Sequence, residues 1–503
     1  MKSQFIILVV GIFLSAQLKA QNQMSNWFFS DSIHIIFLED TIEVNTLPIS
    51  DSIGWPGYNY NIISNSIGEI QLYSNYRYLY DVYGNIINDI VPIYTAPNIG
   101  TSLICPSIQN NEEFYYLYLD NELARLRYCN IKLNYGDSAF FITEEECNVL
   151  LDDDTVNYTN RLNVVKHGNG RDWWIINKVH SVSDSLQPFN VRLYNEGGFN
   201  DPSYYYTDSI LDSYYFQFGQ MTVSEQGDLL AMENGDYVKI YKFDRCTGVI
   251  IHYCEIQILP GIKGLQSVAF SQNGHYLYVS SEGYDSGDVN GISKIWQFNI
   301  GGSSTCEELE ASKQLVYEEP ESYYGWDISD MLLERNSGRI YFTIIKRGIA
   351  PGDDTVTGSQ NLHLHAIMEP DLLGELCNVQ ENVLYLNGFV ARAGLPNMPN
   401  YALGAWEGSP CDTLNETNSV AEVTSPPFKA YPNPVQDHLY IDNPLPTTCQ
   451  AVVFNAMGQE VEGFVLQPGG LTVSTTSWPT GIYQLIVQQE NSNIWKQSLI
   501  KME

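Results

Sequence analysis

Two neighbouring stretches of the chain repeat one pattern of strands and turns, and this repeat restricts the fold more than any other feature. Residues 221–243 read MTVSEQGDLLAMENGDYVKIYKF, and residues 267–298 read SVAFSQNGHYLYVSSEGYDSGDVNGISKIWQF. Each has a strand, a polar turn with glycine, a second strand, a looser loop and a third strand that ends in an aromatic residue. The turn glycines, Gly227 and Gly274, lie 47 positions apart. A period of about 40 to 50 residues with several strands per unit predicts the blades of a β-propeller.

Weaker copies of the pattern occur elsewhere and predict about seven blades in all. From about residue 25 to 410, short runs of Val, Ile, Tyr and Phe alternate with Gly, Asn, Asp and Ser, and long helical periodicity is absent. We therefore expect an all-β chain with a β-propeller domain over residues 21–410. The weaker copies lie at residues 33–44, 66–85, 103–128, 161–194 and 326–368.

The first residues have the layout of a secretory signal peptide. Lys2 precedes an apolar run at residues 5–14, and the stretch ends at Ala20. This pattern predicts a signal peptide at residues 1–20 that is removed after Ala20, rather than a buried N-terminal helix. No later run reaches about 18 apolar residues, so we expect no transmembrane segment in the mature chain.

The sequence changes character near its C-terminal end. Residues 411–428 are polar and contain a Pro-Pro pair, which indicates a linker. Residues 429–503 then alternate polar and apolar positions again in short runs, the pattern of a small β-sandwich. With 503 residues, the chain is long enough for two or more folded units.

Three motifs in this last unit resemble a known export signal. They are YPNPVQDHLYI at residues 431–441, VFNAMGQEV at residues 453–461 and GIYQLIVQQENSNIWKQSLIK at residues 481–501. Their order and spacing resemble the type A sorting domain of the type IX secretion system of Bacteroidetes-type bacteria, an immunoglobulin-like β-sandwich. The resemblance implies the type IX secretion machinery as a partner, and a secreted or outer-surface location reached via the periplasm. The alternative is a generic carbohydrate-binding or fibronectin-like sandwich.

The motifs also name the residues of the expected sorting signal. Prolines stiffen the entry to the domain and cannot donate to a strand ladder, while glycines permit tight turns between strands. The expected signal residues are Tyr431, Pro432, Asn433, Pro434, Gly458, Gly481, Tyr483 and Lys501.

Three segments of the propeller resemble a family of large secreted Bacteroidetes proteins, most of them uncharacterised. They are VKHGNGRDWWI at residues 165–175, SVAFSQNGHYLYVS at residues 267–280 and GLPNMPNYALG at residues 394–404. This resemblance implies fold and export, and it implies almost nothing about activity.

The net charge and the absence of motifs exclude several functions. The formal net charge is −34, which repels phosphate backbones, so we expect no nucleic-acid partner. No nucleophile elbow, P-loop, H-E-x-x-H or dinucleotide motif is present, and no cofactor is identified. The loop with Asp285, Asp288 and Asn290 is rich in oxygen ligands and could take calcium, but it lacks the full pattern of a calcium loop. A solvated turn is the alternative.

The histidines offer two further candidates. His363 and His365 alternate on one predicted strand and share a face, which suits either a metal or a simple surface pair. His167 lies beside Lys166 and Arg171 in the sequence KHGNGRDWW. That cluster could form a site at the propeller mouth, and the alternative is a glycine turn that locks the blade.

Nine cysteines occur in the chain, so at least one is unpaired. Cys246 and Cys254 lie across a predicted turn, which would suit a disulfide between two antiparallel strands. Buried thiols are the alternative.

The sequence as a whole favours a binding or adhesion module at the cell surface, with a glycan or a surface protein as its ligand. The alternative is an extracellular hydrolase or lyase that acts on a polysaccharide or lactone. A convergent set of Asp, Glu and His at the channel mouth would favour the enzyme, and an aromatic, uncharged face would favour the binding module.

Overall fold

A computed structural model divides the chain into two compact units, Met1–Cys411 and Asp412–Glu503. The signal peptide, residues 414–427 of the linker, Gly458 and the loop with Asp285, Asp288 and Asn290 lie outside the described residues. The structure describes residues 24–30, 32–38, 41–49, 60–65, 68–75, 77–88, 101–109, 113–120, 124–134, 139–152, 156–179, 188–207, 221–235, 237–258, 265–281, 292–319, 326–346, 360–391, 394–413, 428–443, 447–455, 459–489 and 492–502.

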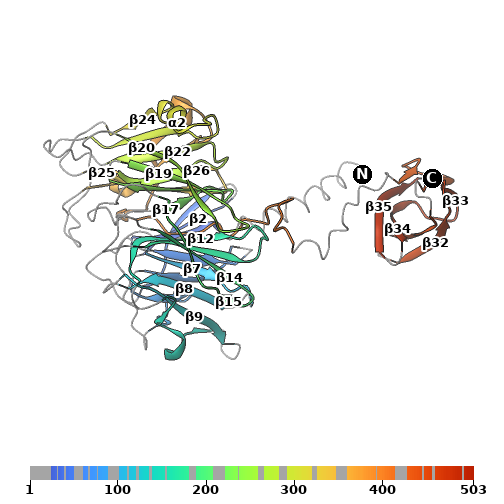
Figure 1. The fold of residues 1–503 in the computed structure, drawn as a ribbon, viewed down its shortest axis with the longest axis horizontal. Helices are drawn as coiled ribbons and strands as arrows, with labels where there is room; N and C mark the ends of the chain where they lie inside the picture. Colours follow the sequence, from blue (N-terminus) through green and yellow to red (C-terminus); the bar gives the residue numbers. More distant parts are fainter. Residues whose placement is uncertain are drawn as a thin grey trace. The chain divides into compact units, whose positions relative to one another are not determined.

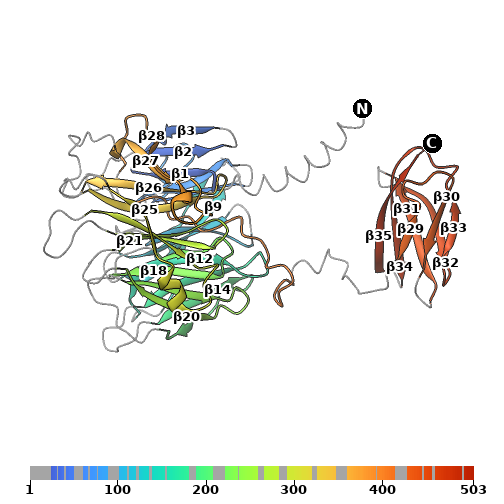
Figure 2. The same ribbon diagram turned by 90° about the horizontal axis from the view of Figure 1, so that it is seen from above.

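Seven antiparallel sheets make up the described part of the first unit, and we number them as blades in chain order (Figures 1 and 2). Blade 1 contains β1 (Asn26–Phe29), β2 (Ile33–Phe37) and β3 (Ile42–Thr46), and blade 2 contains β4 (Asn61–Ser64), β5 (Ile70–Ser74) and β6 (Leu79–Asp81). Blade 3 contains β7 (Ser102–Pro106), β8 (Glu113–Leu119), β9 (Leu126–Asn134), β10 (Ala139–Phe141) and β11 (Val149–Leu150), with the short helix η2 (Glu144–Glu146). Blade 4 contains β12 (Tyr158–Lys166), β13 (Trp173–Val179), β14 (Phe189–Asn195), β15 (Gly198–Phe199) and β16 (Ser203–Tyr205).

The remaining three blades have four strands each within the described residues. Blade 5 contains β17 (Met221–Val223), β18 (Leu229–Asn234), β19 (Tyr237–Phe243) and β20 (Ile250–Gln257). Blade 6 contains β21 (Leu265–Phe270), β22 (Tyr276–Ser281), β23 (Lys294–Asn299) and β24 (Gln314–Glu318), with helix α2 (Cys306–Ala311). Blade 7 contains β25 (Trp326–Glu334), β26 (Arg339–Lys346), β27 (His363–Ile367) and β28 (Val379–Tyr385), with η4 (Gln360–Leu362) and η5 (Gly374–Cys377).

The first strands of successive blades contact one another, from β1 through β4, β7, β12, β17 and β21 to β25. They therefore form the inner side of a ring. The ring closes where Trp27 and Phe37 of blade 1 pack against Tyr341 of blade 7, at ring-centroid distances of 5.8 and 5.3 Å. Blades 1 and 7 keep their own strands, so closure comes from packing of sheet faces. The predicted propeller of about seven blades is confirmed.

The repeat that predicted the blades corresponds to the turn between the first and second strand. In blade 5, Gly227 has φ +76° and its N–H donates to the carbonyl of Ser224, while the Ser224 hydroxyl accepts from the N–H of Leu229. In blade 6, Gly274 has φ +72° and bonds in the same way to Ser271. A positive φ costs glycine nothing, which explains the residue at the same place in both copies.

Side chains on the inner strands link neighbouring blades. Asn26 of blade 1 donates to the hydroxyl of Ser64 in blade 2 at 3.0 Å, and both side chains are buried. Asn163 of blade 4 donates to the carbonyl of Met221 in blade 5 at 2.7 Å. These bonds satisfy buried polar groups and also hold the blades in order around the axis.

The second unit is an immunoglobulin-like sandwich of two sheets, which Figure 2 shows as two layers. Its buried residues form a core of their own, which includes Val435, Leu439, Val453, Leu485 and Leu499. One sheet contains β29 (Lys429–Tyr431), β30 (His438–Asp442) and β33 (Leu471–Ser474), and the other contains β31 (Cys449–Asn455), β32 (Glu460–Leu466), β34 (Gly481–Gln489) and β35 (Ser492–Lys501).

The disulfides correct one prediction. Cys246 pairs with Cys411 and Cys254 pairs with Cys306, so the predicted Cys246–Cys254 bond is wrong. Cys246 lies in the turn between β19 and β20, whereas Cys254 lies within β20 opposite Ile240, so the two are not partners across the hairpin. Cys306 begins α2, which contacts β20, and spacing along the chain does not indicate this contact. The third disulfide is Cys129–Cys147, and the free, buried cysteines are Cys105, Cys377 and Cys449.

Candidate functional site

Residues 394–404 lie at the centre of the propeller, and we call them the channel segment. Residues 394–399 and 401 are buried. The N–H of Leu395 donates to the carboxylate of Asp330 in blade 7 at 2.8 Å. The N–H of Asn397 donates to the carbonyl of Tyr60, next to β4 of blade 2, at 2.8 Å. The segment therefore touches the inner side of blades on both sides of the closure.

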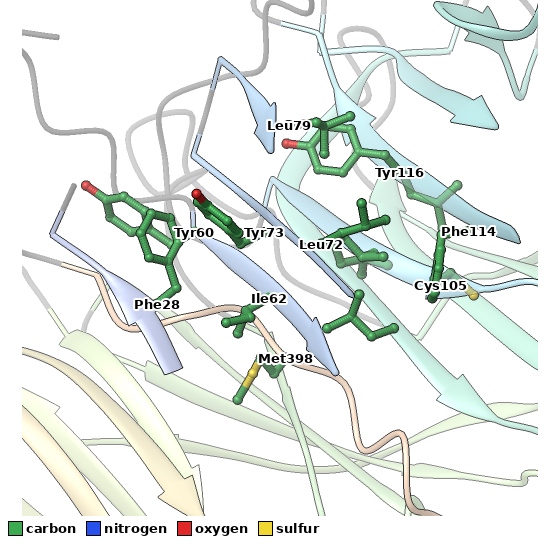
Figure 3. Packing of buried hydrophobic residues seen from close by; sticks show 14 of the residues in the cluster. Phe28, Tyr60, Ile62, Leu72, Tyr73, Leu79, Cys105, Phe114, Tyr116 and Met398 are labelled. Carbon is green, nitrogen blue, oxygen red and sulfur yellow. The ribbon is translucent and has the colours of Figure 1, made fainter. Parts of the chain in front are cut away.

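Two further side chains of the channel segment reach the inner strands. The Tyr401 hydroxyl donates to the carbonyl of Ile104 in β7 at 2.7 Å. Met398 joins the large hydrophobic core and lies beside Ile62 of β4 in Figure 3. The centre of the ring is thus filled by the chain itself.

Two basic side chains, one partly and one fully buried, hold the last part of the channel segment. Lys166 donates to the carbonyl of Tyr401 at 3.0 Å and lies over the ring of Trp173 at 4.8 Å. Burial lowers the pKa of Lys166 to about 8. Arg245 donates to the carbonyls of Gly404 at 2.5 Å and Lys166 at 2.9 Å. Charge-assisted bonds of this kind are stronger than neutral ones, so these residues fix the segment in the channel.

A cavity of about 50 Å³ remains between the channel segment and blades 4 to 7. Glu225 and Arg335 line it and form an ion pair at 2.7 Å, and Asn400 donates to Glu225 at 2.9 Å. A cavity of this size holds a few water molecules. It is too small to enclose a sugar ring.

Asp330 is a fully buried ionisable group that contacts the channel segment. Its carboxylate accepts from the Ser267 hydroxyl at 3.1 Å and from the N–H groups of Leu395 and Met331 at 2.8 and 2.9 Å. Burial raises its pKa to about 6, although these bonds act in the opposite direction. Its partners come from blade 6, blade 7 and the channel segment. Asp330 therefore links two neighbouring blades to the segment at the centre of the ring.

The KHGNGRDWW cluster forms a turn that ties blade 4 to blade 5. His167 Nε2 is 3.0 Å from the carbonyl of Cys246, and its Nδ1 accepts from the N–H of Asn169. The indole N–H of Trp174 donates to the carbonyl of Arg245 at 2.7 Å. Both nitrogens of the imidazole are engaged with the main chain, which favours the structural interpretation of this motif.

The paired histidines lie on β27, the third strand of blade 7. His365 is fully buried, stacks on Phe342 at 5.3 Å and accepts from the N–H of Asn382, so the predicted surface location is wrong for it. His363 is partly exposed and packs on Tyr385 at 5.2 Å. Among the described residues, no group of three or more His, Cys, Asp or Glu is placed to hold a metal ion.

In the sandwich, signal residues from two distant segments meet at one end. The side-chain oxygen of Asn433 accepts from the N–H of Ile500 at 2.9 Å, and Val435 exchanges backbone bonds with Ile500 and Met502. Gly481 pairs with Lys501 across β34 and β35. The entry segment and the last strand are therefore held side by side.

Several apolar side chains of these two segments are exposed. Tyr431 is 52% exposed, Ile500 47% and Met502 42%, and Pro432 and Pro434 are exposed as well. We call these five residues the sorting patch. Ile500 and Met502 are not among the residues expected from the sequence, because alternation along the last strand gives no sign of which side chains stay exposed.

Two other predicted signal residues are buried. Lys501 is buried and its ammonium donates to the carbonyl of Met502 at 2.7 Å. Tyr483 is buried, its hydroxyl donates to the carbonyl of Pro479 at 2.7 Å, and burial raises its pKa. Desolvation thus keeps the phenol protonated as a donor.

Residues 429–501 match the family model described as the secretion system C-terminal sorting domain. The second unit is a sorting domain. It assigns the protein to the type IX secretion route, whose machinery is its partner and which leads to the cell surface or the extracellular space. Within the described residues, no helix is both long enough and apolar enough to cross a membrane.

The propeller is similar to solved structures only at the level of overall shape. A putative 6-phosphogluconolactonase from Bacteroides uniformis is 12% identical with a TM-score of 0.34, over 86% of this chain and 95% of that one. The periplasmic gluconolactonase of Pseudomonas aeruginosa is 10% identical with a TM-score of 0.34, over 84% and 94%. An exo-β-1,3-galactanase from Phanerochaete chrysosporium is 11% identical with a TM-score of 0.30, over 83% and 93%. A search of the curated proteins finds no match. Similarity this low says nothing about activity.

Proposed function

We propose that the protein is a cell-surface or secreted binding module whose propeller holds glycans. In this proposal, a signal peptide at residues 1–20 takes the chain to the periplasm of a Bacteroidetes-type bacterium. The sorting domain, of type A, then carries it across the outer membrane.

The observation that carries the proposal is the channel segment. Ligand and substrate sites of ring-shaped folds gather from loops around the central opening. Here residues 394–404 fill the centre. The polar side-chain atoms of Lys166, Asp330 and Arg245 form hydrogen bonds to the main chain of this segment. The surfaces left for a ligand are the outer strands and turns of the blades, which suits recognition of an extended molecule.

The composition of the exposed surface supports a glycan as that molecule. Tyrosine offers both an apolar ring and a hydroxyl to a ligand that has apolar faces and hydroxyl groups. Among the propeller residues that the structure describes, the exposed aromatic ones are Tyr83, Phe141, Tyr204, Tyr206, Tyr385, Phe389 and Trp406.

A glycan screen with product analysis tests the proposal. The purified full-length mature protein is applied to an array of bacterial, plant and host glycans, and every glycan that binds is incubated with the protein and analysed for products. Binding without turnover is the expected result. Turnover would instead favour the alternative, an extracellular hydrolase or lyase acting on polysaccharide or lactone substrates.

A further inference from the structure

Two exposed tyrosines, two positions apart in the sequence, lie on the outer part of blade 4. Tyr204 lies on β16, opposite Asn190 of β14, and Tyr206 follows directly after the strand. Their exposed fractions are 42% and 66%. Tyr205 between them packs instead against the core shared with blade 5. Because alternate residues of a strand face opposite sides, Tyr204 and Tyr206 present their rings on one face, which we call the tyrosine platform.

A network of polar side chains lies beside the platform. Asn190 donates to the hydroxyl of Tyr158 at 2.9 Å, and that hydroxyl donates to the carboxylate of Asp152. Asp152 also forms an ion pair with Arg192, and both side chains are at most 6% exposed. Burial, followed by the negative charge of Asp152, raises the pKa of Tyr204, so its hydroxyl stays protonated and able to donate.

Several polar atoms in and beside this network lack a hydrogen-bond partner within the described residues. Asn177 pairs with Asn190 across β13 and β14, so both side chains lie on the face of the sheet that carries Tyr204. Within the described part of the chain, Asn190 Oδ1, Arg192 Nε and both polar side-chain atoms of Asn177 have no hydrogen-bond partner. These side chains are buried, with exposed fractions of 0% for Asn177, 1% for Asn190 and 4% for Arg192. Burying polar atoms without hydrogen bonds costs folding free energy. A water held between these atoms and a bound ligand would recover part of this cost.

The charges of the site limit the ligand to a neutral one. Arg192 is already neutralised by Asp152, and the exposed Asp201 lies two residues before β16. The whole chain carries −34. A uronic acid or sulfated sugar would therefore meet repulsion without a cation to offset it.

We propose that the tyrosine platform, Tyr204 and Tyr206, with the adjacent polar row of Asn177, Asn190 and Arg192, is a binding site for neutral glycans. Sugar rings stack on the two phenol rings, and ligand hydroxyls bond to the hydroxyl of Tyr204 and, through water, to the polar row. This inference rests on the proposed glycan-binding function and names the residues and the ligand class.

Calorimetric titration of the full-length mature protein with defined oligosaccharides tests the site. The probes are hexasaccharides of β-1,3-glucan, β-1,4-glucan, xylan and mannan, with oligogalacturonate as the anionic comparison. We expect at least one neutral hexasaccharide to bind and oligogalacturonate to bind at least about tenfold more weakly. Tyr204→Ala and Tyr206→Ala each weaken that binding by about tenfold or more, in line with the loss of one stacked ring.

Two control variants separate stacking from folding. Ile251→Ala removes an apolar side chain that is 59% exposed on β20 of blade 5, and we expect it to leave binding unchanged. Tyr206→Phe keeps the ring and retains most of the binding. Melting temperatures of all variants are measured in parallel, since an exposed side chain contributes little to stability.

The outcomes distinguish this inference from the proposed function. Undiminished glycan binding by the Tyr204→Ala/Tyr206→Ala double variant would overturn the site but leave the binding function standing, as would a preference for oligogalacturonate. Failure of the wild-type protein to bind any glycan would overturn both.

Discussion

At the scale of single residues, adding a methyl group to a glycine tests how closely blade 4 approaches Ala405, the residue after the channel segment. Gly170 has φ +78°, and a Cβ there would lie 2.6 Å from the nitrogen of Ala405. Gly198 has φ +95°, with nothing within 4 Å of the added atom. Gly198→Ala should cost about 1 kcal/mol of unfolding free energy from φ alone, and Gly170→Ala should cost more because main chain must also move. Denaturant unfolding compares the two variants, and equal losses would contradict the close approach.

Asp330 gives the propeller a pH dependence of known sign. The ordinary pKa of an aspartate is 3.8, and burial raises it here to about 6. Between those values the folded protein keeps a proton that the unfolded chain releases, so Asp330 makes the free energy of unfolding fall from about pH 4 to pH 6 and stay level above.

Asp330→Asn removes this titration and keeps an acceptor for the N–H of Leu395. The variant should gain stability relative to the wild type as pH rises from 4 to 7, by up to about 3 kcal/mol. Unfolding curves at pH 4, 5, 6 and 7 measure the difference, with Asp201→Asn on the exposed surface as the control. A difference that stays constant across this range would show that Asp330 does not titrate as described.

At the scale of elements, the sequence predicts what repeats locally. The turn glycines Gly227 and Gly274 are visible because each blade uses the same serine–glycine bonds over a few residues. The channel segment escapes prediction because its partners are main-chain atoms and side chains of blades far away in the sequence, such as Tyr60 and Asp330. Likewise, the tyrosine platform depends on which face of β16 is left uncovered, which strand alternation alone cannot decide.

The longest and the shortest disulfide loops predict different losses of stability when each bond is removed. Cys246–Cys411 closes a separation of 165 residues, and Cys129–Cys147 closes one of 18. Loop-closure entropy predicts losses of about 5 and about 3 kcal/mol when each is replaced by a serine pair. We therefore expect the Cys246→Ser/Cys411→Ser variant to unfold at lower denaturant concentration than Cys129→Ser/Cys147→Ser. If the Cys129→Ser/Cys147→Ser variant instead unfolded at the lower denaturant concentration, loop-closure entropy would not be the main contribution of the Cys246–Cys411 bond to stability.

At the scale of the whole molecule, export and folding are carried by separate units. Deletion of residues 429–503 removes the sorting domain and leaves the core of the propeller untouched, since the two cores share no residues. We expect the shortened protein to remain in the periplasm, as measured by cell fractionation and surface labelling. Val465→Ser, an exposed position on β32 away from the sorting patch, is the control and should be exported normally. Surface display of the shortened protein would contradict the assignment.

The bond between Cys246 and Cys411 also sets the mechanical path through the protein. Cys411 is the last residue of the first unit, and its partner lies between β19 and β20 of blade 5. A pull on the sorting domain therefore reaches the ring at blade 5 through a covalent link. The strands of blade 7 and the channel segment are bypassed. The load therefore meets the four paired strands of blade 5 and does not peel the last blade from the first.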